Sequence, residues 1–285
     1  MCKLFERKTP RAPNLNIDID AIRELTATAR QRAKALKAEA DEAARLQKVW
    51  EDLTSFIEKN WLLHTLDLLG KEAELLKKLR AENHPAIPAL EAVYRSAKEQ
   101  ADLLHRNFIK SLDEACSASK IPLDRDSRHP RYTFEEGFIQ LEIDDYKGLA
   151  RLSDHEGRLD EFPADIGAIV EAGKREHARL FGRQFDGKKF LQKLRRNYLA
   201  VLEKQGETDG ASMPIRKITA RLGKNEERFR TDEFLVDLSR LVERGPAELD
   251  GFRFDLQQTK DTNQGMLLHG AAGRGYVGFI TFRKV

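Results

Sequence analysis

Cysteine is almost missing from this chain of 285 residues, which contains only Cys2 and Cys116. Two distant cysteines are too few for a disulfide framework, and they lack the spacing of a metal-ligand pair. The seven histidines are scattered, and no two have the spacing of zinc ligands on a helix. We therefore expect a reduced, cytoplasmic protein that needs no metal or other cofactor.

Long apolar runs are also absent from the sequence. No stretch approaches the roughly 18 apolar residues that a membrane-spanning helix needs, and the first ten residues lack the apolar core of a signal peptide. Aromatic residues make up only 8% of the chain, while 34% of its residues are charged and 40% are hydrophobic. This balance is typical of long solvated helices rather than of disorder, and the chain is long enough for two domains.

Residues 16–120 are predicted to form a helical region after a flexible N-terminal segment, residues 1–15. Apolar residues recur seven apart, and a second row three residues later is interrupted by Arg32 and Glu39. This pattern predicts a heptad seam with a weak, alanine-rich middle. Two further amphipathic stretches would complete an antiparallel bundle or coiled-coil hairpin. The first row of the seam consists of Ile22, Ala29, Leu36, Ala43, Trp50 and Ile57.

Residues 121–182 are predicted to form a small α/β connecting segment. A polar linker precedes an alternating stretch, residues 138–143, which is typical of a strand. A turn and a short partner strand follow, and a helix is expected to begin after Pro163 and Asp165.

Residues 183–285 predict a winged-helix-like domain. Three amphipathic helices are expected, the second ended by Gly223 and the third begun by Thr231 as its N-cap. Strands that can pair antiparallel follow the helices, which is the order of a winged helix-turn-helix. The expected fold class is therefore mainly α with a minor α+β part.

Positive charge is concentrated in residues 183–230, which hold 13 Lys and Arg against 6 Asp and Glu, although the whole chain has a net charge of only +3. Focused charge attracts polyanions such as nucleic acid, and such side chains can neutralise phosphates. We expect contact with the DNA backbone through these residues and through a cation at the tip of the wing. The predicted nucleic-acid-binding residues are Lys188, Lys189, Lys193, Arg195, Arg196, Arg216, Lys217, Arg221, Lys224 and Arg274.

One feature of this domain argues against base recognition. In a helix-turn-helix the second helix of the motif enters the major groove. The corresponding helix here, residues 231–243, carries Asp232, Glu233, Asp237 and Glu243 against Arg240 alone. An acidic helix is repelled by phosphate, so the domain either contacts DNA through its other helices or docks to protein.

A metal-dependent nuclease is an alternative hypothesis. Asp124 precedes the strand at 138–143, and Asp145-Tyr-Lys147 follows it, which loosely matches the acid and Asp-x-Lys pattern of restriction-type nucleases. The spacing is loose, however, and an Asp-Asp-Tyr-Lys-Gly sequence is an ordinary hairpin turn. The glycine-rich run at 270–275 precedes a strand rather than a helix, so it lacks the geometry of a phosphate-binding loop.

The favoured hypothesis is a non-enzymatic accessory or adaptor subunit of a DNA-associated complex, without a small-molecule ligand. Its helices at 16–120 would bind other subunits or a second copy of the chain. A dimeric winged-helix transcriptional regulator and a purely structural interaction module remain alternatives. The arrangement is similar to that of partner subunits of chromosome-maintenance or phage-defence ATPase complexes, which also join winged helices to long helical segments. This similarity is one of architecture and is not carried by a motif.

Overall fold

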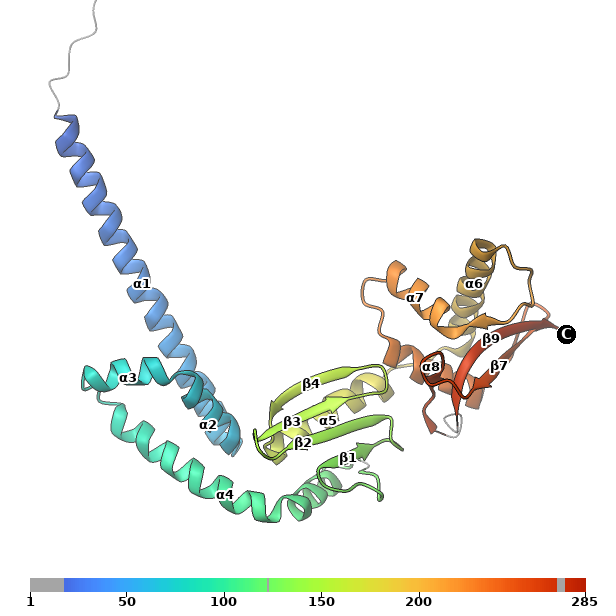
Figure 1. Ribbon diagram of the computed structural model, residues 1–285, viewed down its shortest axis with the longest axis horizontal. Coiled ribbons are helices and arrows are strands. Elements are labelled where there is room, and N and C mark those ends of the chain that lie inside the picture. Colours follow the sequence, from blue (N-terminus) through green and yellow to red (C-terminus); the bar gives the residue numbers. More distant parts are fainter. Residues whose placement is uncertain (1–17, 122, 271–274) are drawn as a thin grey trace, which may run out of the picture. The chain divides into compact units, whose positions relative to one another are not determined.

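The computed structural model describes residues 18–121, 123–270 and 275–285, with the side chains of 103–106 left aside (Figure 1). The predicted flexible segment at 1–15, Cys2 and Arg274 lie outside the described residues. Helix accounts for 57% of the structure and strand for 18%, in two antiparallel sheets, so the protein is mainly α with an α+β part, as predicted. Among the described helices, none is both long and apolar enough to cross a membrane.

The chain divides into two units, residues 1–54 and 55–285. The first unit contains most of α1, Ile19–Glu58. Asp18 caps this helix, because its carboxylate accepts hydrogen bonds from the amides of Asp20 and Ala21 at 3.0 and 3.1 Å. All side chains from residue 18 to residue 40 are exposed.

After the last residues of α1, the second unit has three helices in succession, where the sequence predicted two amphipathic stretches. The chain leaves helical geometry at Glu72, two residues after Gly70, whose freedom weakens a helix. Asp165 anchors the start of the first helix, since its buried carboxylate accepts hydrogen bonds from the amides of Leu63 and His64 at 2.9 and 2.8 Å. The bounds are α2, Leu62–Lys71, α3, Ala73–Ala81, and α4, Ile87–Ala118.

A four-stranded antiparallel meander, in the order β1-β2-β3-β4, follows α4. The sequence predicted only its two central strands. The segment expected to be a polar linker folds onto this sheet: Leu123 forms a β-bridge with Phe134. The elements are β1, Arg131–Phe134, β2, Ile139–Asp144, β3, Leu149–Ser153, β4, Arg158–Pro163, and then α5, Ile166–Phe181.

The C-terminal part of the unit combines three helices with a second antiparallel sheet. Within this sheet the strands lie in the order β5-β9-β7-β6, and β8 pairs with β9. The helices are α6, Gly187–Gln205, α7, Ile215–Asn225, and α8, Thr231–Arg244. The strands are β5, Met213–Pro214, β6, Glu248–Leu249, β7, Phe252–Thr259, β8, Met266–Leu267, and β9, Tyr276–Lys284.

Two predicted helix ends in this part were wrong. Gly223 lies inside α7 rather than after it, and the helix continues for two residues. Thr231 is the first residue of α8 and not its N-cap, a position that Arg230 occupies without a side-chain cap.

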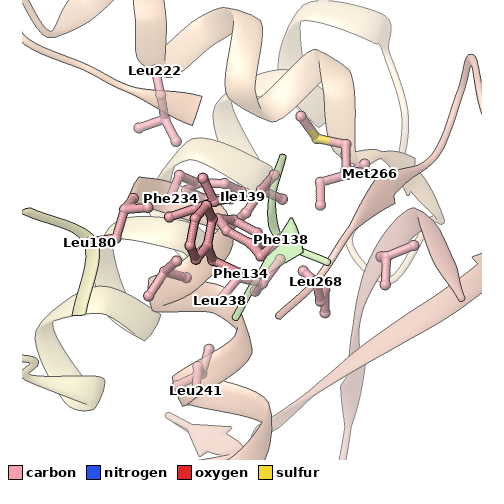
Figure 2. Close-up of a cluster of buried hydrophobic side chains, with 14 of the residues drawn as sticks. Phe134, Phe138, Ile139, Leu180, Leu222, Phe234, Leu238, Leu241, Met266 and Leu268 are labelled. Atoms are coloured by element: carbon pink, nitrogen blue, oxygen red, sulfur yellow. The ribbon is translucent and has the colours of Figure 1, made fainter. Parts of the chain in front are cut away.

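A single cluster of buried apolar side chains joins the end of α4, the first sheet and the C-terminal elements. Phe134 of β1 and Phe138 of the β1–β2 turn belong to the same cluster as Phe234 and Leu238 of α8 (Figure 2). Members of this cluster lie on both sides of residue 182, where the sequence predicts a domain boundary. Burial of this kind contributes about 25 cal/mol for each Å² of apolar surface removed from water.

Candidate nucleic-acid interface

A surface groove with a volume of about 400 Å³ lies between α6 and α7, within the basic tract. Ala200 and Ala220 leave room between the two helices, because a methyl group is the only side chain at each position. Four cations line the groove: Lys204 from α6, and Lys217, Arg221 and Lys224 from α7. None of the described residues that line it is acidic. We call this feature the α6–α7 groove.

Helical spacing explains why these cations converge. Lys217, Arg221 and Lys224 fall at positions i, i+4 and i+7 of α7, which lie on one face of a helix. Arg196 is exposed and stands one and two turns before Ala200 and Lys204 on α6, so it extends the same face beyond the groove. Four of the predicted cations therefore belong to the groove or to its approach.

The hydrogen bonds of the groove leave its charges available. Lys217 donates from Nζ to Oε1 of Gln205, a neutral acceptor, at 2.9 Å. Within the described part of the chain, Nε of Arg221 is buried and has no hydrogen-bond partner. Lys224 is exposed in the last turn of α7. A concave surface that holds several unneutralised cations is suited to an extended chain of phosphates.

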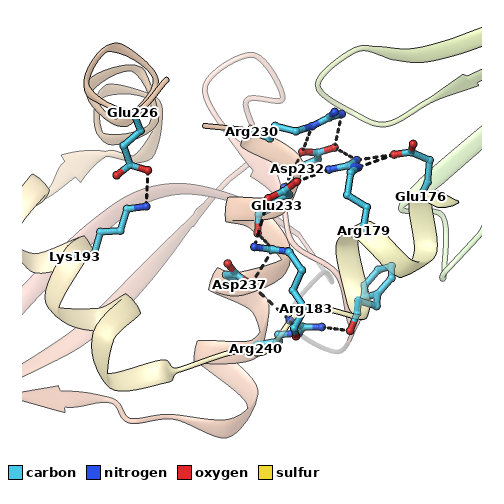
Figure 3. Close-up of polar contacts among 11 residues, drawn as sticks. Glu176, Arg179, Arg183, Lys193, Glu226, Arg230, Asp232, Glu233, Asp237 and Arg240 are labelled. Carbon is cyan, nitrogen blue, oxygen red and sulfur yellow. Dashed lines mark hydrogen bonds and ion pairs between the residues drawn. The ribbon is translucent and has the colours of Figure 1, made fainter. Parts of the chain in front are cut away.

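Lys193 and Arg216, by contrast, are held in ion pairs. Nζ of Lys193 lies 2.6 Å from Oε2 of Glu226, and this pair joins α6 to the end of α7 (Figure 3). The Arg216 guanidinium lies 2.9 Å from Oε2 of Glu156 in the β3–β4 turn and also donates to the carbonyl of Gly265 at 2.8 Å. Both cations join elements of this chain, and their charge is largely compensated.

Arg195 has an internal role that the sequence did not reveal. Its side chain is 10% exposed and makes a two-pronged ion pair with Asp209, with one N–O distance of 2.6 Å. The guanidinium also lies over the rings of Phe252 and Phe282, at 4.2 and 4.9 Å from their centroids. Such cation–π contacts stabilise a packed core, so we assign Arg195 to the fold rather than to the groove.

The remaining predicted cations stand at the start of α6. Asp186 caps this helix by accepting a hydrogen bond from the amide of Lys189 at 3.0 Å. The Lys189 ammonium, 3.3 Å from the same carboxylate, is 82% exposed, and Lys188 is also exposed. These two lysines lie about four turns from Lys204 along α6, so the structure does not bring them into the groove.

Three of the four acidic side chains of α8, those of Asp232, Glu233 and Asp237, turn towards α5 (Figure 3), while Glu243 is exposed. Arg179 of α5 donates to Asp232 and, at 2.9 Å, to Glu233. Arg183, just after α5, donates to Asp237 at 3.0 Å. Most of the acidity of α8 therefore serves an interface within the chain.

The two most buried acids of α8, Asp232 and Asp237, are in different electrostatic states. Burial raises the pKa of Asp232, but hydrogen bonds from Arg179 and Arg230 outweigh it and hold that pKa below its ordinary value. At Asp237 burial prevails over the attraction of Arg183, and the pKa is raised. Asp232 is thus well compensated as an anion, whereas Asp237 is not.

The carboxylates of the nuclease hypothesis have structural partners. Asp124 accepts hydrogen bonds from the amides of Glu136 and Gly137 at 3.0 and 2.7 Å, in a turn where both residues have positive φ. Asp144 accepts from the amide of Lys147, and Asp145 lies 2.6 Å from Nε2 of His129. In the described part of the chain, no three His, Cys, Asp or Glu side chains are grouped so that they could hold a metal ion.

One residue of the groove was missed from the sequence. Lys204 lies in the predicted tract, but Glu203 and Gln205 beside it gave no reason to select it. Its spacing of eight residues from Arg196 was the available signal, since positions i and i+8 share a helix face.

No protein-family model, curated protein or solved structure matches this chain. The function is therefore argued from the chain's own residues.

Proposed function

We propose that this protein is a non-enzymatic accessory subunit of a DNA-associated complex, possessing a winged-helix-like C-terminal domain that binds the nucleic-acid backbone through the α6–α7 groove. The observation that carries the proposal is the convergence of Lys204, Lys217, Arg221 and Lys224 on one concave surface without an acid among its lining residues. Phosphate contacts of this kind supply affinity without reading sequence.

The order of elements supports the winged-helix assignment. A short strand, β5, stands between the first two helices and pairs with β9, which pairs in turn with β7. Three helices followed by antiparallel strands is the order that the sequence pattern predicts for a winged helix-turn-helix, and β5, which the sequence did not predict, joins the same sheet. The predicted wing tip, with Arg274, falls outside the described residues.

The position of α8 favours backbone contact over base recognition. In a helix-turn-helix regulator this helix would enter the major groove of DNA. Here Phe234 and Leu238 of α8 are buried, and Asp232 and Asp237 contact arginines of the chain itself. A dimeric transcriptional regulator is therefore the weaker proposal.

The test is binding of a fluorescein-labelled duplex, measured by anisotropy between 50 and 300 mM salt, values chosen around the physiological range. Each phosphate contact contributes about one unit to the slope of log K against log salt. The triple variant Lys217→Glu, Arg221→Glu, Lys224→Glu should therefore lower the slope by about three and weaken binding at low salt at least a hundredfold.

A matched control separates the groove from the overall charge. Lys77, Arg95 and Lys98 are exposed on α3 and α4, so their replacement by Glu changes the net charge by the same amount. This control should retain most of the affinity and the slope. Equal losses in both variants, or undiminished binding in the groove variant, would remove the groove as the contact surface.

A further inference from the structure

The part of α1 between residues 18 and 40 exposes several large apolar side chains to solvent. Ile22, Leu25 and Leu36 are 50%, 70% and 56% exposed, and every side chain between residues 18 and 40 is accessible. Most helical stability in proteins comes from packing of such a face, because isolated helices are only marginally stable in water. A surface that covers this face would therefore stabilise the helix.

Ile22, Leu25 and Leu36 form an apolar stripe along α1, and its two flanks differ. At ~100° for each residue, and with Leu36 at the centre, Ala33 and Ala40 lie on one side of the stripe. Arg32 and Glu39 lie on the other side, both exposed, at the positions where they interrupt the second row of the seam. The stripe is thus bordered by small residues on one flank and by a pair of opposite charges on the other.

We propose that the partner of this face is α1 of a second copy of the chain, packed antiparallel and centred near Leu36. In an antiparallel pair the same flank of both helices lines each edge of the seam. Arg32 of one copy then lies beside Glu39 of the other, and two-fold symmetry repeats the contact. The alanine flanks meet at the opposite edge and permit close approach. This proposal names a partner for the helices at 16–120 of the proposed accessory subunit, but it does not depend on nucleic-acid binding.

Charge along the helix gives the same orientation. Residues 30–37 hold four cations and no acid, whereas residues 38–44 hold three acids and no cation. A parallel pair in register would place like blocks side by side, at an energetic cost. An antiparallel pair centred at the junction places each basic block against the acidic block of its partner. The surface is therefore complementary to itself, which favours a second copy over an unrelated protein.

Cross-linking of the full-length protein tests the orientation. Position 29 of one helix is level with position 43 of an antiparallel partner, whereas positions 29 and 29 are about 21 Å apart at a rise of 1.5 Å per residue. Chains carrying Ala29→Cys and Ala43→Cys, in a Cys2→Ser background, should form a disulfide when mixed, while Ala29→Cys alone should not. The native Cys116 should form no disulfide between copies, because it is buried and its pKa is raised to about 11. A Leu36→Cys variant, which links copies in either orientation, is the positive control.

Charge reversal tests the contact itself. Arg32→Glu should weaken self-association about tenfold in sedimentation equilibrium, because it opposes two acids at each symmetric contact, and adding Glu39→Arg should restore it. In a parallel pair the affinity of Arg32→Glu should be unchanged, because a layer of like negative charges would replace a layer of like positive charges. Both residues are exposed, and circular dichroism checks that the variants remain helical.

Three results would overturn the proposal: a monomer at all concentrations up to about 100 μM, a range in which specific dimers ordinarily form, self-linking of the Ala29→Cys variant, or an unchanged affinity of Arg32→Glu. Loss of DNA binding in the groove variant with retained dimers would leave it standing. A wild-type chain that stays monomeric but still binds DNA would refute this inference alone.

Discussion

Replacing Asp232 with Asn tests how the C-terminal elements are held to α5. Asp232 is 3% exposed and accepts hydrogen bonds from Arg179 and Arg230. Removing one partner of a buried ion pair costs about 3–5 kcal/mol when the other charge is left uncompensated. Arg179 still has Glu176 and Glu233, so we expect a loss of about 2–3 kcal/mol in the free energy of unfolding.

Asp237 of the same helix provides the matched control. It also contacts an arginine, Arg183, but its pKa is raised because burial prevails. The ionised carboxylate is therefore poorly compensated, and Asp237→Asn should cost about 1 kcal/mol or less. Urea titration at 25 °C gives both differences, and thermal unfolding should show a fall of about 5–10 °C for Asp232→Asn.

The pH dependence of the two variants should have opposite signs. The folded-state pKa of Asp232 is lowered, so its contribution is complete above the unfolded value of about 3.9 and disappears as pH falls through the folded pKa. The stability gap between wild type and Asp232→Asn should therefore stay constant from pH 7 to about pH 5 and narrow as the pH falls further. The folded-state pKa of Asp237 is raised, so the wild type should gain on Asp237→Asn as pH falls. A larger loss for Asp237→Asn at pH 7, or parallel pH profiles, would refute this account of the interface.

Two further substitutions test local features. Gly223→Ala should stabilise the protein by about 0.5–1 kcal/mol in urea titration, because the residue lies inside α7 and an added Cβ meets only Phe229, at 3.5 Å. Gly187→Ala should instead destabilise the protein, because its Cβ would lie 2.5 Å from the carbonyl oxygen of Gly245. If both substitutions changed the free energy of unfolding in the same direction, the surroundings described for the two glycines would be wrong. Arg195→Met should lower stability by about 2 kcal/mol while leaving the salt dependence of duplex binding unchanged, since the guanidinium pairs with Asp209 and stacks on buried rings. A changed salt slope in that variant would show that Arg195 meets phosphate after all.

Helices were predictable from the sequence because their apolar residues repeat over several turns. Gly223 misled the prediction of the end of α7, since glycine favours helix ends, and only the structure shows Phe229 packing near it. The outer strands β1 and β4 gave weak signals. The first has four residues, and the second, Arg158–Pro163, has no fully buried side chain that would impose an alternating pattern.

The candidate site was predictable in part. Lys217, Arg221 and Lys224 have the spacing of one helix face, so their proximity to one another follows from the sequence. The packing of α7 against α6 does not follow from the sequence. The ion pairs that compensate Lys193 and Arg216 do not follow from it either, because their partners are 33 and 60 residues away in the chain. Distant pairing of this kind depends on tertiary packing, which local periodicity does not contain.

Arg240 has a mechanical consequence for the protein. From α8 it donates to the carbonyl oxygens of Phe181 and Arg183, at 2.6 and 3.2 Å, and so holds the stretch of chain that joins α5 to α6. These bonds tie the connector to α8, so a rotation of α6 relative to α5 must break them. If a nucleic-acid strand binds in the α6–α7 groove as we propose, a pull on that strand would load these bonds instead of a flexible tether.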